Sequence, residues 1–245
     1  MFTLEPGGAV DGRALEEIYA YPDPLSRPWV QVNFVSSVDG AATASGKSAG
    51  LSSPADKQIF ALGRDLADVV LVGAGTALVE NYRGIKRTEL RAERRQRLGL
   101  SEVPPIAVVT GRCSIDPGSA LVTDTLVPLI VLTAETAPAD RRAALADAGA
   151  DVVVAGDERV DPHRALAALA ERGLFRVCCE GGPTLFADLI AADLVDQLCL
   201  TVAPLLTGPG ALRIVAGAAR QEPLGLVLAS VLTDDDFLML RYRRA

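Results

Sequence analysis

The chain has 245 residues, of which 49% are hydrophobic and 22% charged, a balance that excludes a disordered, collagen-like or coiled-coil protein. Its net charge is −7, with 21 arginines against 3 lysines. Because excess negative charge repels phosphate backbones, the composition argues against nucleic acid as a partner. It is still compatible with a small anionic ligand held by a few local arginines.

Strand-like and helix-like segments alternate along the chain. Residues 30–36 are rich in β-branched side chains and predict a strand. A helix is expected to begin at Pro54, because Ser53 suits the N-cap and the apolar side chains up to Leu66 fall on one face. Residues 68–73 predict a fully buried strand. Further strands are expected at 106–110, 129–133, 151–155, 174–180 and 197–203, and helices at 138–148, 162–172 and 183–192.

The remaining segments complete the predicted fold. Residues 87–99 are dense in Arg and Glu at helical spacing and predict a solvated helix or a loop excursion. Residues 226–232 and 237–242, joined by a turn at 234–236, predict an antiparallel β-hairpin. The pattern predicts an α/β fold with a mostly parallel central sheet, helices on both faces and a C-terminal hairpin. No internal repeat or clear linker divides the chain.

Cysteine and histidine usage limits the possible chemistry. The four cysteines form no C-x-x-C pair, and His163 is the one histidine. We therefore predict no zinc site and no disulfide framework, with the cysteines packing in a reducing compartment. The charged first twenty residues do not resemble a signal peptide, and no apolar run is long enough to cross a bilayer. A soluble cytoplasmic protein without metal, membrane or nucleic acid is expected.

Two strand–glycine–helix junctions are candidate ligand contacts. The first, VGAGT, places Gly73, Gly75 and Thr76 after a buried strand, where backbone amides can approach a phosphate. It lacks the third glycine of the dinucleotide fingerprint, so a tight structural turn is an equal alternative. The second junction, EGGPTL, covers residues 180–185. Ligands bind at the carboxyl ends of parallel strands, so the two junctions together predict a clamp for the phosphates of a dinucleotide.

Three further positions have both a functional and a structural interpretation. Asp39, at the end of a strand, is either a carboxylate of the site or an Asx-turn residue that caps the backbone. The polar stretch 45–64, with Arg64 at its end, either holds a phosphate or forms a flexible loop. Arg112, just past the strand that ends at Thr110, either pairs with a cofactor phosphate or lies in solvent.

These motifs, in this order, resemble the reductase domain of the bacterial bifunctional riboflavin-biosynthesis deaminase–reductase, a family with a dihydrofolate-reductase-like fold. The matching segments are SSVDGAATASGKS, LSSPADKQIFALGRDLADVVLVGAGT, EGGPTLFADLI and DQLCLTVAPLLTGPG. They extend from about residue 28 to the C-terminus, which implies one reductase domain over 28–245 after an N-terminal extension of residues 1–27. The resemblance implies direct hydride transfer from NADPH to the ribosylamino group of a phosphorylated aminopyrimidine. It also implies a homodimer, for which residues 197–203 and the hairpin offer apolar surface.

The resemblance implies a role for individual residues. Asp39 matches the aspartate that faces the substrate beside the nicotinamide, where it would orient the heterocycle or support a proton transfer. Arg112 matches the position at which family members usually contact the adenosine 2′-phosphate. The implied substrate-binding residues are Asn33, Ser48, Arg64 and Glu180. The implied cofactor-binding residues are Ser36, Gly73, Gly75, Thr76, Glu80, Thr110, Arg112, Gly181, Gly182, Pro183, Thr184 and Leu185.

Two positions depart from the family pattern. Asn33 stands where the family often has lysine, which removes a cation, and Gly50 stands where it often has tryptophan, which removes a stacking surface. Arg87 matches only loosely a family arginine that meets the substrate phosphate. Three functions stay open: a pyrimidine reductase of the riboflavin path, a related reductase of a pterin or folate, and a nucleotide-binding homologue without catalysis.

Overall fold

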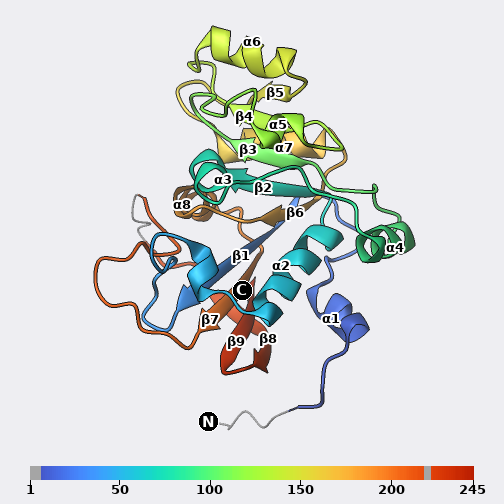
Figure 1. The fold of residues 1–245 in the computed structure, drawn as a ribbon, viewed down its shortest axis with the longest axis vertical. Helices are drawn as coiled ribbons and strands as arrows, with labels where there is room; N and C mark the ends of the chain where they lie inside the picture. The colour runs from blue at the N-terminus through green and yellow to red at the C-terminus, as the bar shows by residue number, and fades with distance from the viewer. Residues whose placement is uncertain (1–6, 218–221) are drawn as a thin grey trace.

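A computed structural model describes residues 7–217 and 222–245. Within these residues, nine strands form one sheet in the order β5-β4-β3-β2-β6-β1-β7-β9-β8. The seven strands β1 to β7 run parallel to one another. The hairpin β8–β9 joins β7 in antiparallel pairing. Figure 1 shows the sheet extending from β5 at the top to the hairpin at the bottom, with α2 in front.

The predicted elements occur in the predicted order, and the helices at 12–19, 48–51 and 120–123 were not predicted. The strands are β1 (Trp29–Ser37), β2 (Val69–Gly73), β3 (Ile106–Val109), β4 (Ile130–Thr133), β5 (Asp151–Val154), β6 (Arg176–Cys179), β7 (Gln197–Ala203), β8 (Leu226–Asp234) and β9 (Phe237–Arg244). The helices are α1 (Gly12–Tyr19), the 3₁₀ helix η1 (Ser48–Leu51), α2 (Pro54–Leu66), α3 (Ala74–Val79), α4 (Glu89–Arg97), α5 (Ala120–Thr123), α6 (Ala139–Asp147), α7 (Pro162–Ala170) and α8 (Pro183–Ala191). The predicted α/β fold with a mostly parallel sheet and a C-terminal hairpin is confirmed. No helix in the described part of the chain combines the length and apolar character that a membrane span requires.

Helices cover both faces of the sheet. Val70 and Val72 of β2 point into the core on the side of α2, whereas Val69 and Leu71 point into the core on the side of α7 and α8. This alternation follows from the two-residue period of a strand. Because both faces are buried, β2 is a continuous apolar run rather than an alternating one.

Helix α1 lies within residues 1–27 and packs on the core of the sheet domain. Asp11 caps it, since its carboxylate accepts hydrogen bonds from the amides of Arg13 and Ala14 at 2.9 and 2.8 Å. Leu15 and Tyr19 are buried in the same apolar cluster as α2 and β2. The described part of the expected extension therefore shares the core of the domain that follows.

Helix α4 differs from the solvated helix that its composition predicts. Arg91, Arg94 and Arg95 fall on one face, and Arg95 is completely buried. Its guanidinium donates to the carbonyls of Asp65 and Ala67 at 3.1 and 2.6 Å, at the end of α2. Burial lowers the pKa of Arg95 to about 10. The prediction is wrong for this face because the arginines find carbonyl and carboxylate acceptors on α2.

Candidate active site

A cavity of about 1080 Å³ opens at the carboxyl ends of the parallel strands. Its wall comes from β1, from α2, from the residues that follow β2 and β6, and from the loops around residues 42–49 and 79–86. Ligands of open α/β sheets bind at this edge. Ligand pockets usually measure about 300–1,000 Å³, so this cavity has room for a cofactor together with a small substrate.

The two predicted glycine junctions meet in this cavity. The amide of Gly73 donates to the carbonyl of Gly181 at 2.7 Å, because β2 and β6 are neighbours in the sheet. A Cβ atom at Gly181 would lie 2.6 Å from the ring of Phe34, and one at Gly182 would lie 2.2 Å from the hydroxyl of Thr76. Close contact with the opposite wall therefore requires glycine at both positions.

One side of the cavity is suited to a phosphate-bearing ligand. The start of α8, residues 182–185, lines the cavity, and no side chain caps its first amides. These amides carry the positive end of the helix dipole, which favours an anion. Gly75 also lines the cavity, and a Cβ atom there would have no neighbour within 4 Å. The predicted dinucleotide clamp thus has both open space and free donors.

Another part of the cavity wall holds a buried charge cluster. Arg64 donates from Nε and Nη2 to the two carboxylate oxygens of Glu180 at 2.6 and 2.7 Å, and the Tyr82 hydroxyl donates to the same carboxylate at 2.6 Å. The Arg64 guanidinium lies over the Phe60 ring at 4.5 Å. The Glu180 side chain is only 1% exposed. The cluster therefore presents a fixed carboxylate to the cavity.

Protonation in this cluster follows from its burial and its partners. Burial alone would lower the pKa of Arg64, but the charge and hydrogen bonds of Glu180 outweigh burial and raise it. Burial and the Glu180 charge raise the pKa of Tyr82 well above its usual value. At neutral pH Arg64 is thus a cation and Tyr82 a neutral donor, and both hold the carboxylate in place.

Ser48 and Glu80 also line the cavity, but they contact each other. The amide and hydroxyl of Ser48 donate to Oε1 of Glu80 at 3.0 and 2.9 Å. This contact ties η1 to the end of α3. Each of Ser48, Arg64 and Glu80 already has a protein partner. The predicted phosphate contacts of Ser48 and Arg64 and the predicted cofactor contact of Glu80 stay predictions.

Asp39 is exposed and does not line the cavity. Its carboxylate accepts hydrogen bonds from the amides of Thr207 and Gly208 at 3.0 and 2.8 Å and from the Ser37 hydroxyl. The Ser37 hydroxyl and the Gly208 amide lower the pKa of Asp39 to about 2. A carboxylate that is ionised at neutral pH suits the predicted orienting role better than the proton-transfer role. The catalytic assignment stays a prediction.

Four predicted cofactor contacts, Ser36, Thr110, Arg112 and Gly181, lie outside the cavity wall. Thr110 is buried and accepts a hydrogen bond from the Ser114 amide at 3.1 Å, so it shapes the turn after β3. Arg112 is exposed beside a second cavity of about 170 Å³, which Arg159 and Leu185 line. Leu185 lines both cavities, so both border the start of α8. Arg159 was not predicted.

Sequence reasoning also missed four cations on the wall of the large cavity, one of which, Arg91 on α4, pairs with Asp65. The other three are Lys57 on α2 and Arg83 and Lys86 in the loop after α3. Lys57 and Arg83 have no ion-pair partner among residues 7–217 and 222–245. Arg87, which matched the family pattern loosely, pairs with Glu102 at 2.7 Å and does not line the cavity. Within those same ranges no group of three His, Cys, Asp or Glu side chains is arranged to hold a metal ion.

Comparison with known proteins identifies the family. A model of the RibD C-terminal domain matches residues 28–240. The chain belongs to the RibD C-terminal domain family. The predicted resemblance to a riboflavin-biosynthesis reductase domain is therefore confirmed.

Two curated relatives and one solved structure show how similar the family members are. The 2,5-diamino-6-ribosylamino-4(3H)-pyrimidinone 5′-phosphate reductase of Archaeoglobus fulgidus is 34% identical over 184 residues, which are 74% of this chain and 83% of the relative. The reductase of the same name from Methanothermobacter thermautotrophicus is 33% identical over 187 residues, covering 74% and 80%. A pyrimidine reductase-like protein from Corynebacterium diphtheriae has a TM-score of 0.83 at 26% identity, covering 94% of this chain and 98% of that one. The prediction of an oxidoreductase of this family is confirmed.

Proposed function

We propose that this chain is an NADPH-dependent reductase that converts the ribosylamino group of a 5′-phosphorylated aminopyrimidine into a ribitylamino group. One observation carries the proposal: a single cavity joins the two glycine junctions to the Arg64–Glu180–Tyr82 cluster. The first part suits a dinucleotide and the second a polar heterocycle. The names of the relatives specify a reductase of such a phosphorylated pyrimidine.

The cofactor side of the cavity suits NADPH. The free amides of Gly182, Thr184 and Leu185 would hold its phosphates, with Gly73 and Gly75 leaving room for the chain of the dinucleotide. The second cavity would receive its adenosine end, where Arg112 and Arg159 are available for the 2′-phosphate. When bound, NADPH supplies the hydride.

The protein's own residues bind and orient the substrate. Glu180, held by Arg64 and Tyr82, would accept hydrogen bonds from the N–H groups of the heterocycle. Asn33 is nearly buried and lines the cavity, and its amide offers one donor and one acceptor side in place of the family lysine. Holding the acceptor carbon in a fixed place accounts for much of the rate enhancement in such reactions.

The unpaired cations on the wall lead to a prediction about the substrate phosphate. Arg83→Ala is expected to raise KM for the phosphorylated substrate about tenfold or more, because one hydrogen-bonded charge contact to phosphate contributes about 1.5–3 kcal/mol. KM for the dephosphorylated compound should not change. Steady-state NADPH oxidation measures both values.

A matched control is available near the edge strand β5 of the sheet. Arg141 of α6 is also exposed and lies outside the cavity, so Arg141→Ala should leave KM for both compounds unchanged. Equal effects of Arg83→Ala on both compounds would show that Arg83 does not meet the phosphate. Turnover of dihydrofolate instead of the pyrimidine would identify the protein as a pterin or folate reductase. NADPH binding without oxidation by either acceptor would indicate the non-catalytic homologue.

Asp39 gives a prediction with a defined pH dependence. Its pKa of about 2 lies below the ordinary value for aspartate, so its stabilising contacts are present above about pH 4 and are lost as the pH falls toward 2. Asp39→Asn is therefore expected to lower kcat/KM by the same factor at every pH between 5 and 9. The measurement is the pH profile of both proteins. An ionisation near neutral pH that disappears in the variant would contradict the ionised, orienting role.

We also propose a homodimer in the cytoplasm. β7 pairs on both sides and is largely buried, so the predicted apolar surface on this strand is not available. The edge strand β8 offers exposed Leu226, Val227 and Leu228 instead, and an apolar edge of this kind favours pairing with a second copy. The four cysteines are free and buried, which supports a reducing compartment.

A further inference from the structure

Helix α1 is joined to α4 by a buried ion pair. Nε of Arg94 donates to Oε1 of Glu16 at 2.7 Å, and Arg97 pairs with the second oxygen. The side chains of Glu16 and Arg94 are only 14% and 11% exposed, so water screens this pair weakly. Glu16 precedes residues 28–240, the part of the chain that matches the family model.

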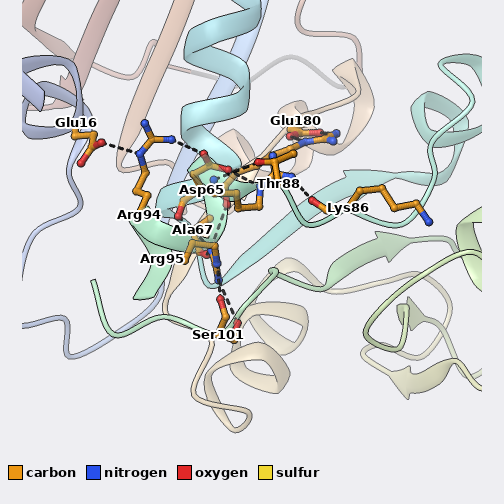
Figure 2. Close-up of polar contacts among 11 residues, drawn as sticks. Glu16, Asp65, Ala67, Lys86, Thr88, Arg94, Arg95, Ser101 and Glu180 are labelled. Atoms are coloured by element: carbon orange, nitrogen blue, oxygen red, sulfur yellow. Dashed lines mark hydrogen bonds and ion pairs between the residues drawn. The ribbon is translucent and has the colours of Figure 1, made fainter. Parts of the chain in front are cut away.

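Arg94 connects Glu16 to a second carboxylate. Its Nη1 pairs with Oδ2 of Asp65, whose Oδ1 accepts from Nε of Arg91 at 2.5 Å. Figure 2 shows Arg94 between Glu16 and Asp65. The side chain of Asp65 is 5% exposed and faces two guanidinium groups. One carboxylate therefore serves two arginines, and Glu16 supplies the second negative charge.

Arg91 connects Asp65 to the wall of the cavity. It lines the cavity, and its Nη1 donates to the carbonyl of Lys86, which also lines it. The loop at 82–86 carries Tyr82 and the free cation Arg83. The position of this part of the wall thus depends on how Asp65 holds Arg91.

We propose that Glu16 is a positioning residue for the substrate side of the cavity. By binding Nε of Arg94, Glu16 leaves Arg94 only one contact with Asp65 and reserves the other oxygen for Arg91. Without Glu16, the Arg94 guanidinium can form a bidentate contact with both oxygens of Asp65, since arginine prefers two parallel hydrogen bonds to one carboxylate. Arg91 would then lose its carboxylate partner Asp65. The segment of residues 82–88, which includes the loop at 82–86, would lose the support of the Arg91–Lys86 contact.

Two readouts test this inference, which rests in part on the proposed function. Glu16→Gln keeps the size of the side chain and removes its charge. It is expected to raise KM for the phosphorylated pyrimidine about threefold to tenfold, the size expected for a lost, partly buried ion pair. kcat and KM for NADPH should stay within about twofold of wild type, since the fold and the cofactor side are intact. Amide hydrogen exchange of residues 82–88 should become faster, while exchange in the sheet is unchanged.

The controls separate positioning from general stability. Glu17→Gln removes a neighbouring carboxylate whose contact with Arg13 is largely exposed, and it should match wild type in both readouts. Asp65→Asn should change the same two readouts in the same direction and more strongly. Unchanged KM and exchange in Glu16→Gln would overturn the inference, and so would faster exchange throughout the chain with a fall in kcat. If wild type reduces no pyrimidine, the proposed function fails and exchange at 82–88 alone decides about Glu16.

Discussion

Glu180→Ala is expected to lower the free energy of unfolding by about 3 kcal/mol and to abolish turnover. The substitution leaves the buried Arg64 cation and the Tyr82 hydroxyl without their acceptor. Removing one partner of a buried ion pair costs about 3–5 kcal/mol, because the remaining charge stays desolvated. The lower end applies since the Arg64 side chain is 19% exposed and can regain some water. Chemical denaturation monitored by circular dichroism measures this loss.

An exposed pair of the same geometry provides the control. Arg172 binds both oxygens of Asp151 at 2.7 and 3.1 Å, but these side chains are 32% and 41% exposed. Asp151→Ala should therefore change the free energy of unfolding by no more than about 1 kcal/mol and leave turnover intact. The arginine–carboxylate geometry is alike in the two pairs, so the contrast between the variants reports burial together with the additional Tyr82 hydrogen bond of Glu180.

Glu180→Gln separates the structural from the functional part of this effect. The amide keeps the volume of the side chain and one acceptor oxygen, so the loss of stability should be smaller than in the alanine variant. Its turnover should still fall, since the amide cannot accept hydrogen bonds at both positions. If Glu180→Gln reduces the pyrimidine as fast as wild type, Glu180 does not orient the heterocycle and serves only to anchor Arg64.

The elements of the sheet could be predicted because local sequence determines them. The apolar run of β2, Pro54 after the Ser53 cap, and the glycines before α8 each have a local physical cause. Their order along the chain then predicts that the two glycine junctions share one edge of the sheet. The Gly73–Gly181 hydrogen bond agrees with that prediction.

The pairing of charges could not be predicted in the same way. Arg64 and Glu180 are far apart in the sequence, and either side chain alone is equally consistent with a ligand contact or an ion pair. The arginines of α4 show the same limit: high charge density predicts solvent exposure, but only the tertiary fold supplies Asp65 and the carbonyls of α2. A signal was present, because Arg91, Arg94 and Arg95 repeat at i, i+3 and i+4 and so share a face.

Gly181→Ala and Gly75→Ala are expected to change stability in opposite directions and both to weaken NADPH binding. Gly181 has φ of +86°, and a Cβ atom there would lie 2.6 Å from Phe34, whose ring is stacked on Phe186. Left-handed backbone costs alanine about 1–2 kcal/mol and overpacking about 1–3 kcal/mol. We therefore expect Gly181→Ala to lose about 2–4 kcal/mol of stability.

Gly75 has neither a left-handed backbone nor a close neighbour at its Cβ position. It lies in α3 with open space around its missing side chain, so alanine should stabilise the free protein by about 0.5–1 kcal/mol through better helix propensity. That methyl group would occupy space that we assign to the cofactor, and the NADPH dissociation constant should rise about tenfold. Thermal unfolding and fluorescence titration with NADPH measure the two effects. A Gly75→Ala protein that is more stable and binds NADPH as tightly as wild type would place the dinucleotide elsewhere, because a cofactor lying over Gly75 cannot tolerate the added methyl group.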